Sequence, residues 1–321
     1  MRSGDGVGPR SRPSASVVIC AYTEKRWDDL AHSVDALANS SNPPEEIVVV
    51  IDHNDLLLKK ARTELAGALV LTNQERQGLS GARNTAVAAA TGDVVVFLDD
   101  DARPTEGWLD RLLSHYDDPE IMGVGGGADP IWPDARPKWF PTEFDWVVGC
   151  SWTGLPTTVA PIRNMIGCNM SFRRETFAIA GDFREDMGRI GTRPLGCEET
   201  ELCIRLRQRR PSTVLLHDPS ARVDHRVSPD RTRWRYFASR CYAEGLSKAM
   251  VTGAVGQRDG LAAERAHTLR VLPRGVGRGL RDLARGDVAG LTRAGSIVGG
   301  FAITATGFAR GRLALRKHSG S

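Results

Sequence analysis

Three consecutive carboxylates, Asp99, Asp100 and Asp101, directly follow the apolar run at residues 94–98. Such runs are typical of buried strands in a parallel sheet, and ligands of open α/β sheets bind beyond the carboxyl ends of these strands. Residues two apart in an extended chain point the same way, so Asp99 and Asp101 can converge on one cation. Carboxylate oxygens suit Mg²⁺ or Mn²⁺. An acidic turn is the simpler alternative, and residues 102–104 are expected to end regular structure.

The rest of the chain supplies a sheet that could position these carboxylates. Short apolar runs alternate with segments whose apolar residues have helical spacing. The predicted strands are residues 16–22, 46–52, 68–72, 94–98, 121–129, 169–172 and 214–217. The predicted helices are residues 28–39, 55–66, 81–90, 107–115, 200–209 and 231–250, with more helix from 261 onward. This alternation predicts an α/β protein with a mainly parallel central sheet and right-handed crossovers.

Composition sets the domain organisation. The chain has 321 residues, 41% hydrophobic and 26% charged, which fits one large globular domain with an appendage. Residues 1–14 lack apolar periodicity and are expected to form a disordered leader without a secretory signal. The alternating pattern occupies residues 15–250, and residues 251–321 are expected to form a basic helical extension. The six cysteines have no metal-type spacing, which favours reduced thiols in a cytoplasmic protein.

Basic charge gathers in the C-terminal extension. Residues 251–321 contain 12 Lys/Arg and 4 Asp/Glu, although the whole chain has a net charge of only +4. Within the extension, the uncharged segment 294–309 is shorter than the roughly 20 residues that span a bilayer. Its predicted apolar helical face consists of Ile297, Phe301, Ala305 and Phe308. This face suits peripheral contact with an anionic membrane, and packing on the domain or on a homodimer partner is the alternative.

Five motifs occur in a fixed order along the chain. They are Ser16–Glu24, Ile47–Asp52, Gly78–Asn84, Phe97–Asp101 and Gly196–Leu202. Together they resemble the motifs of family 2 glycosyltransferases, over about residues 14–250. The resemblance implies an inverting enzyme with the GT-A fold, a Rossmann-like architecture that binds nucleotide-diphosphate sugars. Residues 50–54 and 144–149 are most similar to the subgroup of glucosyl-dolichyl-phosphate glucuronosyltransferases.

The resemblance implies a nucleotide pocket at the strand ends. Its residues would be Ala21, Tyr22, Glu24, Asp52, Arg83, Asn84, Asp99 and Asp100. A carboxylate such as Asp52 can accept hydrogen bonds from a uracil N–H or a ribose hydroxyl, and the Arg83 guanidinium can bind the diphosphate. The alternatives are that Asp52 caps the following helix, that Tyr22 belongs to the core and that Arg83 lies on a solvated helix face.

The same resemblance implies a metal ion, Mn²⁺ or Mg²⁺, that bridges the nucleotide phosphates. Asp101 would be its principal ligand, and Asp99 would face the ribose, the metal or both. His225 would be a histidine, late in the sequence, that lies near the metal. A core or surface histidine is the alternative for His225.

An inverting transfer also needs a base that takes the proton of the acceptor hydroxyl. In the family, this base comes from an acidic pair that opens a helix, here Glu198-Glu199. The second residue is commonly Asp, so Glu199 departs from the pattern. We expect Glu199 to be the base and Glu198 to support or bind the acceptor. The alternative is that both acids only stabilise the helix dipole.

Two further groups of side chains allow two interpretations each. Four tryptophans in one proline-rich stretch either stack on sugars or cover the sheet edge, namely Trp132, Trp139, Trp146 and Trp152. Several arginines either are solvated or hold a donor carboxylate or acceptor phosphate, namely Arg189, Arg193, Arg226, Arg231, Arg233, Arg235 and Arg240. Of these, Arg240 resembles a family position near the mouth of the active site.

The predicted function is therefore transfer of a hexose or glucuronic acid from a nucleotide donor, expected to be UDP-linked. The expected acceptor is a glycan or a polyprenyl-phosphate-linked molecule, reached at the cytoplasmic face of a membrane. No nucleic-acid partner is expected, since the basic tail has no interleaved aromatic residues. The alternative is a catalytically weak nucleotide-sugar-binding component of a glycan assembly complex, for which the departure at Glu199 is the argument.

Overall fold

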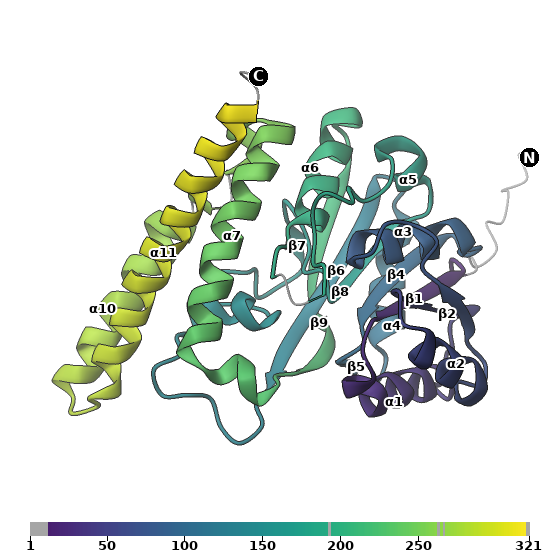
Figure 1. The fold of residues 1–321 in the computed structure, drawn as a ribbon, viewed down its shortest axis with the longest axis horizontal. Coiled ribbons are helices and arrows are strands. Elements are labelled where there is room, and N and C mark those ends of the chain that lie inside the picture. The colour runs from purple at the N-terminus through teal and green to yellow at the C-terminus, as the bar shows by residue number, and fades with distance from the viewer. Residues whose placement is uncertain (1–11, 192–193, 262–263, 266, 319–321) are drawn as a thin grey trace, which may run out of the picture.

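The computed structural model describes residues 12–191, 194–261, 264–265 and 267–318. Within these residues, a nine-stranded sheet has the order β3-β2-β1-β4-β8-β6-β9-β5, with β7 paired to β9 (Figure 1). Its strands are β1 (Ala15–Ala21), β2 (Glu46–Ile51), β3 (Leu69–Thr72), β4 (Val94–Asp99), β5 (Ala102–Pro104), β6 (Ile121–Ile131), β7 (Ala160–Pro161), β8 (Asn169–Arg173) and β9 (Val214–Arg226). Strands β3, β2, β1 and β4 are parallel, β8 is antiparallel to β4 and β6, and β9 is parallel to β6. The predicted α/β class is confirmed.

Helices cover both faces of this sheet. They are α1 (Trp27–Ala38), α2 (Asp55–Glu64), α3 (Leu79–Ala89), α4 (Trp108–Leu113), α5 (Glu175–Ala180) and α6 (Glu198–Arg209). Successive side chains of a strand point to opposite faces. Val17 and Ile19 of β1 therefore pack in one core with α1, α2 and α4, whereas Val18 packs in the other with α3, α5 and α6. Burial on both faces explains why these strands read as uninterrupted apolar runs.

Strands β5 and β9 differ from the sequence prediction. The expectation that residues 102–104 end regular structure is wrong, because they form β5, which pairs with β9 and sets Ala102 opposite His225. The strand predicted over 214–217 continues to Arg226, with a register shift against β6 between Asp218 and Arg222. This pairing brings the end of β9 beside the carboxylates that follow β4.

The C-terminal helices form a layer at one end of the molecule, away from β1 to β3 (Figure 1). They are α7 (Trp234–Val255), α8 (Gln257–Gly260), a π-helical turn (His267–Val271), α10 (Leu272–Ala284) and α11 (Ala289–His318). Helix α11 runs along α7, and Gly245 and Gly307 meet so closely that a Cβ on either residue would collide with the backbone of the other helix. None of the described helices is long and apolar enough to cross a membrane.

The apolar face predicted within 294–309 is only partly buried. Ile297 is buried in a cluster with Phe144 and Phe237, while Phe301, Ala305 and Phe308 border a cavity, and Phe301 is 44% exposed. The N-terminal part of this face therefore packs on the domain. The predicted leader lies mostly outside the described residues, which begin at Arg12, and the Arg12 guanidinium forms an ion pair with Asp110 at 2.7 Å. All six cysteines are free thiols.

Candidate active site

A cavity of about 1210 Å³ lies at the carboxyl ends of β1, β2 and β4. Its walls come from these strand ends, from α3 and α6, from the segments 144–156 and 162–168, and from the C-terminal layer of α7, α11 and residues 267–274. The cavity therefore joins the sheet edge, where the predicted carboxylates lie, to the helices of the C-terminal extension.

Two carboxylates and one imidazole meet at the sheet edge. The ligand atoms of Asp99, Asp101 and His225 all lie within 4.8 Å of one another, with Asp101 Oδ1 3.2 Å and Asp99 Oδ2 4.0 Å from His225 Nε2. Asp101 and His225 are buried, and Asp101 Oδ1 has no hydrogen-bond partner. A buried carboxylate oxygen of this kind is costly unless something binds it. The three side chains thus form a group that fits a divalent cation, and we call it the metal cluster.

Two arginines balance the charge of the acidic triplet. Arg26 Nη1 lies 2.6 Å from Asp100 Oδ1 and 3.3 Å from Asp101 Oδ2, and Arg231 Nη2 lies 3.3 Å from Asp101 Oδ2. Burial raises the pKa of Asp101, but His225, Arg231 and Arg26 together hold it well below its usual range. Asp100 differs, because burial raises its pKa to about 7 despite Arg26. Burial also lowers the pKa of His225, although Asp101 opposes this, so the ring is held in the neutral form that binds metals.

Sequence reasoning missed Arg26. It lies in a 3₁₀ turn (Glu24–Arg26) just after β1, and β1 is the parallel neighbour of β4. Because β1 and β4 are neighbours, the residues that follow them meet at the same edge of the sheet, and this order of strands could have indicated the contact of Arg26 with the acidic triplet. Glu24 in the same turn is exposed and does not line the cavity, so the structure does not bring this predicted nucleotide-pocket residue to the site.

Asp52 is fixed directly after β2 by two donors. Its carboxylate accepts hydrogen bonds from Gly78 N at 3.1 and 3.2 Å and from Asn73 Nδ2 at 2.7 Å. Gly78 has φ of 137°, and a Cβ there would meet Ile190 and Arg189 at 3.1 and 3.2 Å, so glycine is required for this approach. The N-cap alternative for Asp52 is wrong, because Asn54 accepts the hydrogen bond from Leu57 N and caps α2.

Of four other predicted nucleotide-pocket residues, three line the cavity and one does not. Ala21 is buried and Tyr22 half-buried, and both line the cavity, so Tyr22 is not fully part of the core. Arg83 is 2% exposed, which excludes a solvated helix face, and its guanidinium donates to Glu198 Oε1 at 2.7 Å. Asn84 does not line the cavity, because its amide side chain bonds both backbone groups of Phe183 at 2.9 Å.

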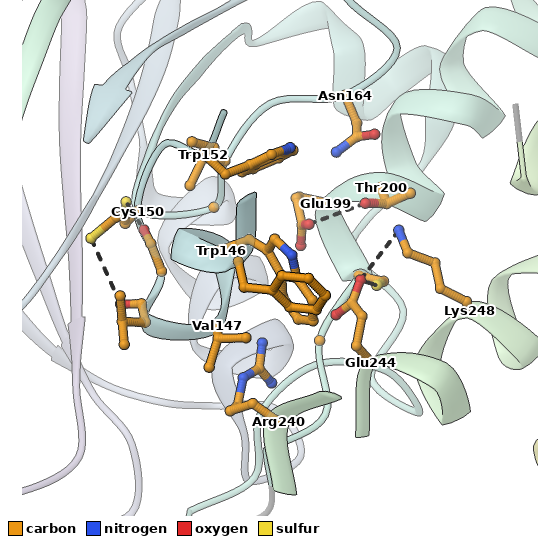
Figure 2. Close-up of a pocket in the computed structure, with 18 of the residues that line it drawn as sticks. Trp146, Val147, Cys150, Trp152, Asn164, Glu199, Thr200, Arg240, Glu244 and Lys248 are labelled. Carbon is orange, nitrogen blue, oxygen red and sulfur yellow. Dashed lines mark hydrogen bonds and ion pairs between the residues drawn. The ribbon is translucent and has the colours of Figure 1, made fainter. Parts of the chain in front are cut away.

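The acidic pair opens α6 and lines the same cavity, linked to the metal cluster by Arg83, which lies 3.7 Å from Asp99. Glu198 is buried against Arg83, whereas Glu199 is half-buried, lines the cavity and accepts a hydrogen bond from Thr200 Oγ1 at 3.1 Å (Figure 2). Burial, reinforced by the Glu198 charge, raises the pKa of Glu199 to about 7. Cys197, directly before the acidic pair, has a left-handed backbone with φ of 71°, which is uncommon for a residue other than glycine and recurs at functional sites.

The four tryptophans divide between the two interpretations. Trp132 and Trp139 pack against Phe140 with ring centroids 5.2 and 5.3 Å apart, so they belong to the core under the C-terminal layer. Trp146 packs on the same core through Phe144, at 5.5 Å between ring centroids, and also lines the cavity. Trp152 is half-buried and, like Trp146, projects into the same cavity as Glu199 (Figure 2).

The arginines divide as well. Arg189, Arg231 and Arg240 line the cavity. Arg226 instead pairs with Asp29, and Arg233 and Arg235 are exposed, so the interpretation as substrate-binding groups fails for these three. Arg193 lies outside the described residues.

Comparison with known proteins places this constellation in a family. The sequence pattern described as "Glycosyl transferase family 2" matches residues 16–179, and the chain is 30% identical over 240 residues to the glucosyl-dolichyl phosphate glucuronosyltransferase of Haloferax volcanii, covering 74% of this chain and 76% of that protein. This chain belongs to glycosyl transferase family 2. It is also 26% identical to the succinoglycan biosynthesis protein ExoM of Rhizobium meliloti, over 82% of this chain and 79% of that protein.

The fold of this family 2 glycosyltransferase has solved counterparts. The mannosyltransferase PcManGT from Pyrobaculum calidifontis, solved in complex with GDP-Man and Mn²⁺, superposes with a TM-score of 0.59 at 18% identity, covering 94% of this chain and 90% of that one. At this identity the likeness shows the GT-A fold. The family 2 membership agrees with the motifs that the sequence shows.

Proposed function

We propose that this protein is an inverting, metal-dependent glycosyltransferase that moves a hexose or glucuronic acid from a UDP-linked donor. One observation carries the proposal: Asp99 and His225 of the metal cluster line the same cavity as Glu199, a half-buried glutamate whose pKa is about 7, and Asp101 lies buried directly behind them. The metal cluster would hold the ion that stabilises the leaving diphosphate, and the glutamate would take the proton of the attacking hydroxyl. An inverting displacement needs these two functions on opposite sides of the transferred sugar.

Asp99, Asp101 and His225 would hold the metal ion. When bound, the ion supplies Lewis-acid stabilisation of the charge on the leaving nucleoside diphosphate. The imidazole favours Mn²⁺ over Mg²⁺, because Mg²⁺ prefers an all-oxygen set of ligands. Arg26 and Arg231 keep Asp101 ionised, and so keep it able to bind a cation.

The nucleoside would lie between the ends of β1 and β2. Tyr22 offers a ring there, and the Asp52 carboxylate is aligned by Gly78 and Asn73. Asp52 would accept hydrogen bonds from the uracil or the ribose. Arg83 is committed to Glu198, which supports a role in fixing the acidic pair.

Glu199 would take the proton of the acceptor hydroxyl. A carboxylate whose pKa is near the working pH can accept a proton in the transition state and release it afterwards. Trp146 and Trp152 provide half-buried aromatic faces in the same cavity, and such faces suit the apolar faces of sugar rings. The wall of Phe301, Ala305 and Phe308 offers apolar surface for a lipid-linked acceptor. The relative from Haloferax volcanii is named for a dolichyl-phosphate-linked acceptor, which supports a polyprenyl-phosphate-linked one here, and the likeness to ExoM supports a glycan.

We also propose a peripheral position at the cytoplasmic face of a membrane. Exposed apolar side chains gather on the C-terminal layer, at Leu269, Leu280, Val288, Leu291, Val298, Phe301 and Leu313. The same layer carries the basic surplus of the chain. Apolar and basic groups together suit an anionic lipid surface, and a second copy of the chain in a homodimer is the competing partner.

A donor screen tests the proposal. The full chain is incubated with Mn²⁺ and a panel of UDP- and GDP-linked sugars, and release of the nucleoside diphosphate is measured with and without EDTA. We expect slow hydrolysis of a UDP-linked sugar that EDTA stops. Metal-dependent nucleotide binding without hydrolysis or transfer would instead favour the weak binding component.

A further inference from the structure

Arg189 and Arg240 line the cavity near the metal cluster and the acidic pair without a carboxylate to balance their charge. Arg26, Arg83, Arg163 and Lys248 each pair with Asp or Glu. Among the described residues, no carboxylate forms an ion pair with Arg189 or Arg240. Arg240 is 9% exposed and donates from Nη1 to Pro194 O, while its Nε is buried without a hydrogen-bond partner. Buried charges are normally paired, because an unpaired one loses its hydration without compensation.

These arginines converge with Arg231 on one place. Burial raises the pKa of the Tyr236 hydroxyl, but Arg231, Arg189 and Arg240 together hold it below its usual range, and Arg189 also donates to it. Burial lowers the pKa of Arg189, and the charges of Arg240 and Arg231 lower it further. Arg189 and Arg240, which have no carboxylate, therefore share the Tyr236 hydroxyl with Arg231, whose charge Asp101 partly balances.

The location lies between the metal cluster and the acidic pair. Arg231 contacts Asp101 of the metal cluster. Arg240 contacts Pro194, four residues before Glu198, and projects into the cavity (Figure 2). The nucleoside would lie at the ends of β1 and β2. An anionic group bound by these arginines would instead lie beside the transferred sugar and the acceptor.

We propose that Arg189, Arg240 and Arg231 bind a second anionic group of the substrates, a carboxylate or phosphate distinct from the nucleotide diphosphate. The inference rests on the proposed function, because it assumes that a nucleotide sugar occupies the strand ends. Two sources carry this chemistry: the carboxylate of a transferred uronic acid, or a phosphate on the acceptor. A planar guanidinium binds either group through two parallel hydrogen bonds.

Calorimetry on the full chain distinguishes the two sources. In the first arm, UDP-glucuronic acid and UDP-glucose are titrated in the presence of Mn²⁺. In the second arm, decyl phosphate and decyl glucoside are titrated into protein saturated with UDP and Mn²⁺. The variants are Arg240→Gln and Arg189→Gln, and the matched control is Arg233→Gln, on the same segment but with a side chain 73% exposed.

We expect one anionic probe to bind more tightly than its neutral counterpart, and the cavity variants to reduce that preference roughly tenfold or more. Preference for UDP-glucuronic acid identifies the donor carboxylate, and preference for decyl phosphate identifies the acceptor phosphate. The affinity for UDP should stay unchanged in every variant, and Arg233→Gln should match the wild type. Arg240→Lys replaces Arg240→Gln should the latter not fold, and it should lose most of the preference because one ammonium cannot form the paired contact.

Two results overturn the inference in different ways. If wild-type protein binds UDP with Mn²⁺ but shows no preference in either arm, or if the variants keep the preference, the arginine site is wrong and the proposed function stands. If wild-type protein binds no nucleotide at all, the proposed function fails and the inference fails with it.

Discussion

Asp101 shows how surroundings change the meaning of a residue. From the sequence it is one carboxylate of a loop, but in the structure it is 3% exposed and faces His225, Arg26 and Arg231. Removing its charge would leave the buried Arg231 without its carboxylate and Arg26 with Asp100 alone, and that cost adds to any loss of metal binding. Experiments that replace Asp101 therefore also need a variant at a more exposed ligand, whose replacement disturbs the structure less.

The first prediction concerns metal binding. Asp101→Asn and Asp99→Ala should each weaken Mn²⁺-dependent UDP binding by about two orders of magnitude, since even residues supporting a ligand affect metal affinity by roughly 10–100-fold. Calorimetry with and without Mn²⁺ measures this effect. Asp99 is one-third exposed, so Asp99→Ala should keep the unfolding temperature of the wild type. Asp28→Ala, at an exposed carboxylate outside the cavity, is the control. Normal Mn²⁺-dependent affinity in folded Asp99→Ala and Asp101→Asn would remove the metal assignment.

The second prediction concerns the base. Glu199→Gln should cut the transfer rate by roughly 10²-fold or more while leaving UDP affinity nearly unchanged, because general-base catalysis has that magnitude. In wild-type protein the rate should rise with pH through about 7, where Glu199 loses its proton. Rates measured between pH 5.5 and 8.5 test both statements. A wild-type rate that is flat across this range, or a fast Glu199→Gln variant, would assign the base elsewhere.

The third prediction follows from the raised pKa of Glu199 and concerns the stability of the folded protein. The pKa of Glu199 is raised from 4.5 to about 7, so the folded protein holds this proton more tightly than the unfolded chain. The stabilisation is complete below pH 4.5 and is lost as the pH rises through 7. Glu199→Gln should thus raise the unfolding temperature at pH 8 by about 2–4 °C, the change for ~1 kcal/mol in a domain of this size, and should change it little at pH 5. An equal effect at both pH values would contradict the burial argument.

At the scale of elements, the sequence predicts strands and helices well where each is locally periodic. The carboxyl ends of β1, β2 and β4 are readable because apolar runs stop at polar residues there. Pairing between distant segments is not periodic, so β5 and the continuation of β9 were not predictable in this way. That pairing brings His225 opposite Ala102, and thereby completes the metal cluster. The helix after residue 294 was predicted to have an apolar face, but periodicity does not say what covers a face.

The fourth prediction tests the contact of α7 with α11. Gly307→Val should destabilise the protein by about 1–3 kcal/mol or more, since the new side chain would collide with the backbone of α7 at Tyr242. Gly295→Ala in the same helix is the control, because nothing lies within 4 Å of its Cβ, and it should stabilise by up to ~1 kcal/mol. Urea unfolding measures both changes. Equal effects of the two substitutions would show that the close contact does not contribute to stability.

At the scale of the whole molecule, the cavity joins two parts with different character. The sheet edge contributes polar residues such as Asp99, Asp100 and His225, and the C-terminal layer contributes apolar residues such as Phe301 and Phe308. The outward side of the same layer exposes Val298 and Leu313. The C-terminal layer thus has one side in the cavity and another side on the outer surface of the protein.

The fifth prediction concerns membrane attachment. The full chain should bind liposomes containing anionic lipid more tightly than neutral ones, and salt should reverse the binding only in part, because apolar burial persists when charges are screened. Val298→Ser with Leu313→Ser should reduce the salt-resistant part. Val159→Ser, at an apolar residue of similar exposure far from the layer in sequence, is the control. Equal binding to neutral and anionic liposomes, or a concentration-dependent dimer that the double variant abolishes, would identify a second copy as the partner.

The order of the site residues along the chain has a consequence for synthesis. The sheet and all three residues of the metal cluster are present once Arg226 has been made, but the wall of Phe301, Thr304, Ala305 and Phe308 is made about 75 residues later, in α11. Domains fold from the N-terminal side as the ribosome releases the chain. A nascent chain can therefore assemble its cation site while this side of the cavity is still inside the ribosome.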